Sequence, residues 1–371
     1  MNRRLLFLFS ALLIILASCT AGRMIIYNFA DIKDYKKFAN RPIQAPSDTW
    51  TFSYGDSLKP PKTITADGES MAWRDFLEEY KSVAFLLIRN DTILIEDYLN
   101  GYDEESIVTS FSVAKSVVSI LYGIAIEEGI ISGVDEPVTQ YIPELKEAGF
   151  DKVTIEHLLQ MTSGLKFNES YANPFGEAAN YYYGSNLERL VTHAKLENEP
   201  GAEFNYVSGD TQILTLILSR ALGEKAVSAY FEEKIWKPLG MEFDASWSLD
   251  KKDGLEKGFC CLNMRARDFA KIGRLYLNKG NWNGTQIVPA DWVAQSTKVD
   301  SSNGSADYYQ YQWWLFPEKN EFYANGILGQ YIFVSPDKNI VAVRLGKKTA
   351  GVGWSGFISK LSESYGQQIQ E

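Results

Sequence analysis

One apolar stretch, residues 109–129, carries a serine and a lysine at its start. The rest of the stretch is almost wholly apolar, which is typical of a helix buried inside a protein. Ser112 and Lys115 are three residues apart, and residues at this spacing share one face of a helix. A buried ammonium is costly unless it is paired, neutral or used, and both desolvation and the positive helix end lower a lysine pKa. The stretch therefore predicts a nucleophilic Ser112 with Lys115 as its own base.

The Ser-x-x-Lys spacing alone is a weak signal, because it occurs four times in the chain. The other three serines lie in polar or turn-forming surroundings, where a solvated serine and lysine sharing a spacing need no explanation. They are Ser163, Ser248 and Ser335. Only Ser112 opens a long apolar helix, so only there does the lysine require a role.

The chain has few of the residues that other catalytic mechanisms need. The chain has two histidines, His157 and His193, and no Gly-x-Ser-x-Gly elbow, which disfavours a Ser-His-Asp triad. We interpret His157 as a helix-packing residue. No His-Glu-x-x-His pair and no glycine-rich phosphate loop occur, so the sequence predicts neither a metal site nor a cofactor.

The amino-acid composition restricts the kinds of partner that the chain can bind. With 47 acidic and 37 basic residues the net charge is −10, which argues against binding nucleic acid. At 371 residues, 45% of them hydrophobic, the chain is long enough for one large domain or two lobes.

The N-terminus resembles a bacterial lipoprotein signal. Arg3 and Arg4 precede an apolar core over residues 5–16, and Leu16-Ala-Ser-Cys19 follows. We expect removal of residues 1–18, lipidation of Cys19, and a location at the extracytoplasmic face of the bacterial cell envelope. Membrane contact would then come only through the lipid. An ordinary signal peptide or an uncleaved anchor is the alternative.

The remaining cysteines are the adjacent pair Cys260 and Cys261. Adjacent cysteines seldom bridge each other, so we predict no disulfide framework even in an oxidising compartment. A vicinal redox pair is the alternative.

The distribution of predicted elements indicates an α+β fold. Residues 19–65, rich in proline, are expected to form an irregular N-terminal segment. The β-rich runs 83–88 and 92–98 predict a hairpin, and the pattern returns to strands from about residue 300. We therefore predict one domain over residues 66–371. It would hold an antiparallel sheet flanked by helices, built from about 66–108 and 300–371, with a mostly helical lobe inserted over about 110–265.

Several strings, in a consistent order, resemble the serine β-lactamase and penicillin-binding superfamily. More narrowly, they resemble the branch with class C β-lactamases, family VIII esterases and aminohexanoate-oligomer hydrolases. The strings are Ser112-Val-Ala-Lys115, Val153-Thr-Ile-Glu-His-Leu-Leu-Gln-Met-Thr-Ser-Gly-Leu165, Pro200-Gly-Ala-Glu-Phe-Asn-Tyr206, Pro238-Leu-Gly-Met241 and Ala266-Arg-Asp-Phe-Ala-Lys-Ile-Gly273.

The resemblance implies further site residues. Tyr206-Val-Ser208 is similar to the family's Tyr-x-Ser element, which makes Tyr206 a proton shuttle and Ser208 a supporting residue. The backbone amides of Ser112 and Ile327 would form the oxyanion hole. Asn325-Gly326 stands where β-lactamases carry Lys-Thr-Gly, so the cation that meets the penicillin carboxylate is missing. A glycine at position 326 is still expected, because the backbone there must pass close to the bound acyl group of the substrate.

The same resemblance implies substrate contacts at Glu169, Tyr171 and Trp313, although core or rim packing explains the aromatic residues equally well. The resulting hypothesis is a serine hydrolase that cleaves a small ester, amide or peptide through an acyl-enzyme. A D,D-peptidase or β-lactamase, and a lipoprotein that binds cell-wall fragments without turnover, are the alternatives.

Overall fold

The computed structural model describes residues 20–27, 29–55, 60–66, 69–171, 173 and 175–366. The predicted signal peptide and Cys19 lie outside the described residues.

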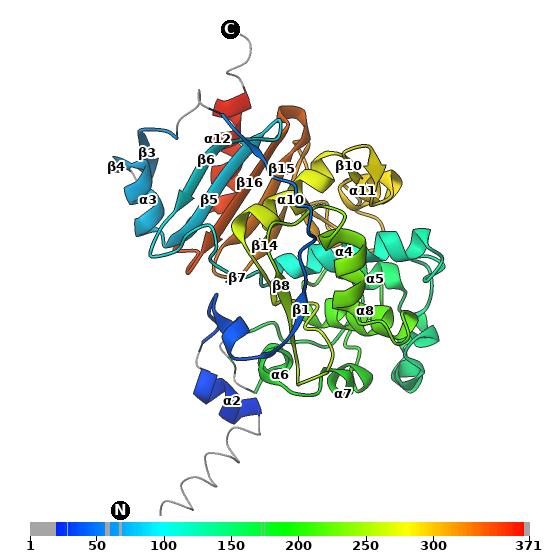
Figure 1. The fold of residues 1–371 in the computed structure, drawn as a ribbon. Helices are drawn as coiled ribbons and strands as arrows, with labels where there is room; N and C mark the ends of the chain where they lie inside the picture. Colours follow the sequence, from blue (N-terminus) through cyan, green and yellow to red (C-terminus); the bar gives the residue numbers. More distant parts are fainter. Residues whose placement is uncertain are drawn as a thin grey trace, which may run out of the picture.

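An eight-stranded sheet forms the frame of the molecule (Figure 1). All neighbouring pairs are antiparallel except β2 with β6, which confirms the α+β fold with an antiparallel sheet. In spatial order the strands are β12 (Tyr309–Gln310), β13 (Trp313–Phe316), β14 (Glu321–Gly326), β15 (Gln330–Ser335), β16 (Ile340–Gly346), β5 (Ser82–Arg89), β6 (Thr92–Tyr98) and β2 (Ser53–Tyr54).

Helices cover both faces of this sheet, and the central strands are buried for that reason. All eight side chains of β5 are buried. Leu86 packs into the cluster that includes α10 (Ala266–Leu277), whereas Phe85 and Leu87 pack with α3 (Trp73–Glu79) and α12 (Trp354–Gly366). This is the alternation that a strand imposes on its side chains. The hairpin predicted over residues 83–98 is confirmed.

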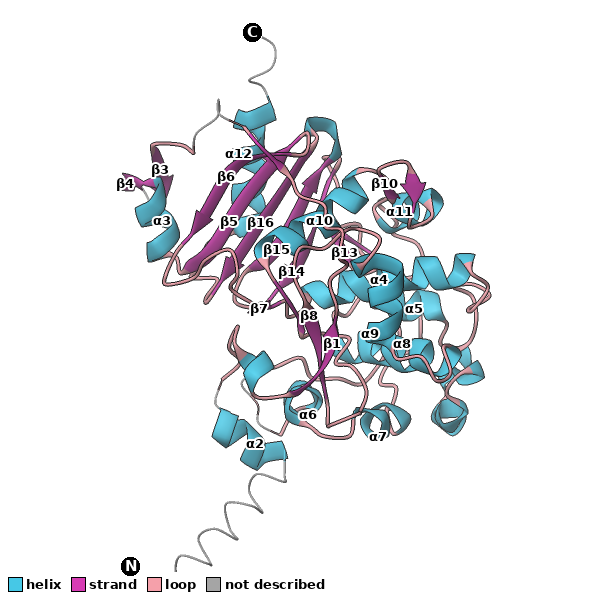
Figure 2. Ribbon diagram, in the orientation of Figure 1, coloured by secondary structure: helices cyan, strands magenta, loops and turns pink. Residues whose placement is uncertain are grey.

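A second lobe is mostly helical and packs against one end of the sheet (Figure 2). Its α-helices are α4 (Val113–Glu127), α5 (Ile155–Leu159), α6 (Glu177–Tyr183), α7 (Leu187–Thr192), α8 (Ser208–Ala221), α9 (Val227–Phe231) and α11 (Ala290–Ser296). Short 3-10 turns lie at Asp34–Lys36, Val138–Gln140, Pro143–Ala148, Phe150–Lys152 and Pro336–Lys338, and a π-turn at Glu232–Trp236.

A four-stranded antiparallel sheet joins the two parts, in the order β1 (Ala39–Ile43), β8 (Ala245–Leu249), β9 (Leu262–Met264) and β7 (Val108–Thr109). Two hairpins complete the strands, β3 (Thr63–Ala66) with β4 (Glu69–Ala72) and β10 (Asn281–Trp282) with β11 (Thr285–Gln286).

The expectation of an irregular N-terminal segment is wrong. Residues 20–65 contribute the helix α2 (Thr20–Tyr27) and strands β1, β2 and β3. Pro42 is accepted within β1 because β1 is an edge strand, where a missing N–H leaves no ladder bond broken.

Candidate active site

Ser112 lies in a sharp turn between β7 and α4, immediately before the first residue of the helix. Phe111 just before it has a φ of 46°, a conformation that residues other than glycine rarely adopt. The turn is held by β9, because the Ser110 N–H donates to the Leu262 carbonyl and the Leu262 N–H donates back to Ser110 Oγ. A constrained turn of this kind presents the Ser112 hydroxyl in a fixed position.

Lys115 lies one helical turn further on and is buried, at 1% exposure. Its Nζ donates to three acceptors: Ser112 Oγ at 3.0 Å, Ser208 Oγ at 3.0 Å and the Phe259 carbonyl at 2.9 Å. Burial lowers the pKa of Lys115 to about 8, while the negative charge of Glu169 opposes this shift. Near neutral pH a sizeable fraction of the amine is therefore uncharged and in contact with the serine.

Glu169 fixes the orientation of Ser208, at the start of α8. Glu169 accepts the Ser208 N–H at 2.7 Å and the Ser208 hydroxyl at 2.6 Å. Because the hydroxyl hydrogen is committed to the carboxylate, Ser208 Oγ can only accept from Lys115. A neutral Lys115 then directs its two N–H bonds to Ser208 and Phe259, which leaves its lone pair directed toward Ser112.

The ring of Tyr206 also contacts the lysine, with its centroid 5.1 Å from Lys115 Nζ. Burial, and secondarily Glu169, raise the pKa of Tyr206 well above its usual value, and a side-chain hydrogen bond with Ser112 opposes the shift. The phenol therefore keeps its proton at neutral pH and can donate it.

Gly326 brings the end of β14 against the serine turn. A Cβ at Gly326 would lie 2.5 Å from the Ser110 carbonyl oxygen and 3.2 Å from the Ser112 nitrogen. The sequence predicted that the backbone at Gly326 passes close to the bound acyl group. In the structure, Gly326 lies against the backbone of the turn that contains Ser112. Asn325, one residue earlier, is paired with Tyr331 in the sheet, and Ile327 follows at the pocket. Gly326 is therefore packed against the backbone of the serine turn, and Ile327 and Ser112 line the same pocket.

A pocket of about 270 Å³ opens at Ser112. Of the described residues that line it, none carries a charged side chain, and most are aromatic or aliphatic. The lining consists of Phe29, Ala30, Phe111, Ser112, Tyr171, Ala178, Ala179, Tyr182, Tyr183, Ser208, Phe259, Cys260, Ile327 and Leu328. An apolar pocket of this kind favours an uncharged acyl group.

Of the three residues that the resemblance implies as substrate contacts, one lines the pocket and two do not. Tyr171 does line the pocket, and its hydroxyl donates to Glu169. Glu169 contacts Ser208 and Tyr171, which makes it an internal partner of the site. Trp313 is fully buried and stacks on Tyr276 of α10, with ring centroids 4.3 Å apart, so this prediction is wrong.

Trp313 is buried because successive side chains of β13 point to opposite faces of the sheet. Trp313 points into the core, and its neighbour Trp314 points to the other face, where its ring lies 5.4 Å from that of Tyr206. The sequence did not indicate which of the two adjacent tryptophans lies on the side of Tyr206.

The prediction that Cys260 and Cys261 are unbridged is also wrong. The structure has a disulfide between them, with Cα atoms 3.7 Å apart. Adjacent cysteines seldom pair because the peptide between them restricts the approach of the two sulfur atoms. Here Cys261 adopts a φ of 71°, and the segment around the pair is fixed by hydrogen bonds to β8.

Sequence reasoning missed several groups at the site, among them the Phe259 carbonyl, and Phe29 and Ala30 in the pocket wall. No pattern in the sequence marks any of them. His157, interpreted as a helix-packing residue, caps α5 by a reciprocal hydrogen bond with Thr154.

Within the described parts of the chain, no group of three or more His, Cys, Asp or Glu side chains is placed to hold a metal ion. No helix in the described ranges is long and apolar enough to cross a bilayer.

Comparison with known proteins agrees with this geometry. The sequence profile of the Beta-lactamase family matches residues 73–353. The 6-aminohexanoate-dimer hydrolase of Paenarthrobacter ureafaciens is 27% identical over 340 residues, covering 81% of this chain and 86% of that protein.

Solved structures show the same fold. A Bacillus anthracis protein described as a 6-aminohexanoate-dimer hydrolase has a TM-score of 0.80 at 24% identity, with 92% of this chain and 94% of that chain covered. A family VIII carboxylesterase has a TM-score of 0.59 at 17% identity, with 74% and 89% covered.

Proposed function

The chain belongs to the β-lactamase family and is a serine hydrolase, and on that premise we propose that it cleaves esters or amides of uncharged acyl groups through a covalent enzyme intermediate. The single observation that carries the proposal is the buried contact of Lys115 Nζ with Ser112 Oγ at the mouth of an apolar pocket. The proposed catalytic residues are Ser112, Lys115 and Tyr206, with Ser208 and Glu169 in support.

In the acylation step Ser112 Oγ attacks the substrate carbonyl and its proton passes to Lys115. The backbone amides of Ser112 and Ile327 would stabilise the negative charge that develops on the carbonyl oxygen. Tyr206, which holds its proton at neutral pH, donates it to the leaving group and recovers a proton from Lys115. In deacylation the same groups activate water, which releases the acid.

The proposed substrate class follows from the pocket. The ammonium of an aminohexanoyl group would be desolvated there without a carboxylate partner among the described lining residues. We therefore favour neutral acyl groups over the substrate in the name of the Paenarthrobacter relative. A penicillin carboxylate lacks a cationic partner at Asn325-Gly326, so β-lactamase activity is expected to be weak.

The proposal is tested by intact-protein mass after treatment with a fluorophosphonate. The wild type is expected to gain one adduct and Ser112→Ala none, because only an activated serine reacts. Absence of an adduct on both proteins would reject catalysis and favour the alternative of a binding lipoprotein.

The substrate class is tested with two activated esters of equal chain length, p-nitrophenyl hexanoate and p-nitrophenyl 6-aminohexanoate. We expect kcat/KM to be at least about tenfold higher for the neutral ester, because burying an unpaired ammonium costs more than the about 1–3 kcal/mol of an unpaired neutral polar group. Equal values, or a preference for the amine, would show that a charged partner reaches the pocket.

We also propose that Cys19 is lipidated and that the lipid alone holds the protein at the extracytoplasmic face of the bacterial cell envelope. The proposal rests on Leu16-Ala-Ser-Cys19 after the basic and apolar N-terminal segments. Metabolic labelling with an alkyne-tagged fatty acid should mark the wild type and not Cys19→Ala.

A further inference from the structure

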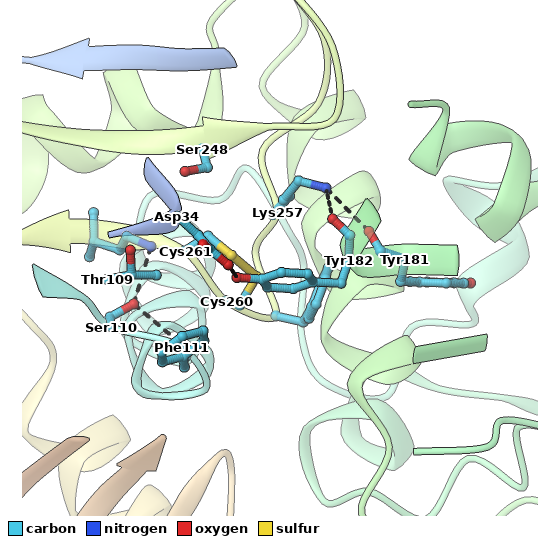
Figure 3. Close-up of a disulfide and its surroundings, with 12 residues drawn as sticks. Asp34, Thr109, Ser110, Phe111, Tyr181, Tyr182, Ser248, Lys257, Cys260 and Cys261 are labelled. Atoms are coloured by element: carbon cyan, nitrogen blue, oxygen red, sulfur yellow. Dashed lines mark hydrogen bonds between the residues drawn. A yellow bond between two sulfur atoms is a disulfide. The ribbon is translucent and has the colours of Figure 1, made fainter. Parts of the chain in front are cut away.

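Figure 3 shows the disulfide Cys260–Cys261 close to Tyr182 and to the turn at Ser110. Cys260 is among the pocket-lining residues, beside Tyr182, so a small molecule that enters the pocket meets the disulfide. Cys261 is fully buried behind it. None of the hydrolytic steps described above uses either sulfur atom.

Both flanks of the disulfide contact the catalytic residues. On one side, the Phe259 carbonyl accepts a hydrogen bond from Lys115 Nζ at 2.9 Å. On the other, Leu262 exchanges two hydrogen bonds with Ser110, two residues before the nucleophile. A shift of the peptide at residues 260–261 must therefore reach the lysine, the serine turn or both.

The rest of the segment is held to β8. The Trp247 indole N–H donates to the Cys260 carbonyl at 3.1 Å, and the Ser248 N–H donates to the Cys261 carbonyl at 2.9 Å. Just upstream, the buried ammonium of Lys257 donates to the carbonyls of Tyr181 and Tyr182, as Figure 3 shows. With its surroundings fixed, the segment can respond to bond cleavage mainly at the two cysteines and their nearest peptides.

Cys261 adopts a φ of 71°, a conformation disfavoured for residues with a side chain. While the sulfur atoms are bonded, the ring that they close with the intervening peptide restricts the backbone. Once that bond is broken, Cys261 is free to return to a negative φ. The two peptides that flank Cys261 would then rotate and break the hydrogen bonds that Trp247 and Ser248 donate to their carbonyls. This change would shift the adjacent residue Phe259, and its carbonyl would turn away from Lys115.

We propose that Cys260–Cys261 is a reversible thiol–disulfide site whose oxidation state controls hydrolysis at Ser112 through the Phe259 carbonyl. The inference rests on the proposed function, because it needs Lys115 to be the base. The oxidised form is the active one, in which the carbonyl helps to orient the lysine lone pair toward the serine.

The reaction partner is a dithiol. Its first thiolate attacks Sγ of Cys260, the cysteine of the pair that lines the pocket. A mixed disulfide forms, the Cys260–Cys261 bond breaks, and the Cys261 thiolate takes a proton. The second thiol of the reductant then attacks the mixed disulfide and releases the Cys260 thiol. Two cysteine thiols are formed, and the reductant leaves as its own disulfide.

The test uses full-length protein purified in detergent, with and without dithiothreitol. Thiols are counted by alkylation and mass mapping of the peptide that contains residues 260–261. We expect no free thiols there before reduction and two after it. In parallel, kcat/KM for p-nitrophenyl hexanoate should fall about tenfold or more, because a small displacement of a catalytic group is costly. Reoxidation should restore it.

The pH profile separates this effect from a general loss of structure. Loss of a carbonyl acceptor destabilises the ammonium, so the acid limb of kcat/KM should move to lower pH on reduction. A structural loss would lower the rate at every pH without moving the limb. Cys261→Ser should behave like the reduced wild type and should no longer respond to dithiothreitol.

The outcomes distinguish the two proposals. If fluorophosphonate labels Ser112 at the same rate in both oxidation states, the proposed control by the disulfide is overturned and the hydrolase stands. Two free thiols in the protein as isolated from an oxidising compartment, with full activity, would overturn it as well. No labelling in either state would reject the proposed function and this inference together.

Discussion

Replacing Lys115 with methionine is expected to lower kcat/KM by about a hundredfold to ten-thousandfold, the range that a positioned general base contributes. Lys115 is the buried side chain within hydrogen-bond reach of Ser112 Oγ, and methionine matches its length without a proton acceptor of comparable strength. The fold should survive, because an apolar side chain suits a site where burial already disfavours the ammonium. Ester turnover and the thermal unfolding midpoint measure the two effects.

The wild type should show an acid limb that belongs to this lysine. Burial lowers the pKa of Lys115 to about 8, and the neutral amine is the reactive form. Below that pH the amine is protonated, so kcat/KM should fall as the pH drops through about 8 and reach a plateau above it. In Lys115→Met this limb should be absent.

Lys257→Met provides a matched control. Lys257 is also fully buried and its pKa is also lowered by burial, but its ammonium contacts the carbonyls of Tyr181 and Tyr182. This variant should keep the acid limb of the wild type even if it unfolds at a lower temperature. A Lys115→Met protein that retains wild-type kcat/KM would rule out Lys115 as the base.

The contact between Ser112 and Lys115 could be predicted from sequence because it is local. Ser112 and Lys115 are three residues apart on one helix, so the spacing alone brings their side chains together once the helix forms. The hairpin of β5 and β6 could be predicted for the same reason, since its two β-rich runs lie close together in the chain. The antiparallel sheet was predicted from the strands expected at both ends of the chain. Tyr206 and Ser208 needed the family resemblance, because their approach to Lys115 spans more than 90 residues.

The remaining features depend on contacts that no local pattern encodes. Glu169 reaches Ser208 across 39 residues, and only the fold shows that it orients Ser208. The prediction for Trp313 was wrong because successive side chains of a strand point to opposite faces, so a shift of one residue reverses the face. Which face of β13 meets α10 is decided by tertiary packing. Phe29 enters the pocket from a segment that proline content marked as irregular. In each case, packing between elements that are far apart in the sequence determines where the side chain lies.

Replacing Gly326 with alanine is expected to lower kcat by about a hundredfold to a thousandfold, comparable to the loss of one oxyanion donor. The new Cβ would lie 2.5 Å from the Ser110 carbonyl oxygen, a backbone atom that cannot rotate away. The end of β14 must therefore move outward, and the Ile327 amide moves with it. Since the charge on the carbonyl oxygen develops in the transition state, the loss should appear mainly in kcat and much less in KM.

The control is Gly356→Ala on α12, where an added Cβ meets nothing within 4 Å. This exposed helix position should tolerate alanine with unchanged kinetics, since alanine is the better helix former. Fluorophosphonate labelling separates the two parts of the site in Gly326→Ala. If Ile327 is an oxyanion donor, the adduct should still form at Ser112, only more slowly, because Lys115 is intact. Wild-type kcat in Gly326→Ala would mean that the Ile327 amide does not take part in the reaction.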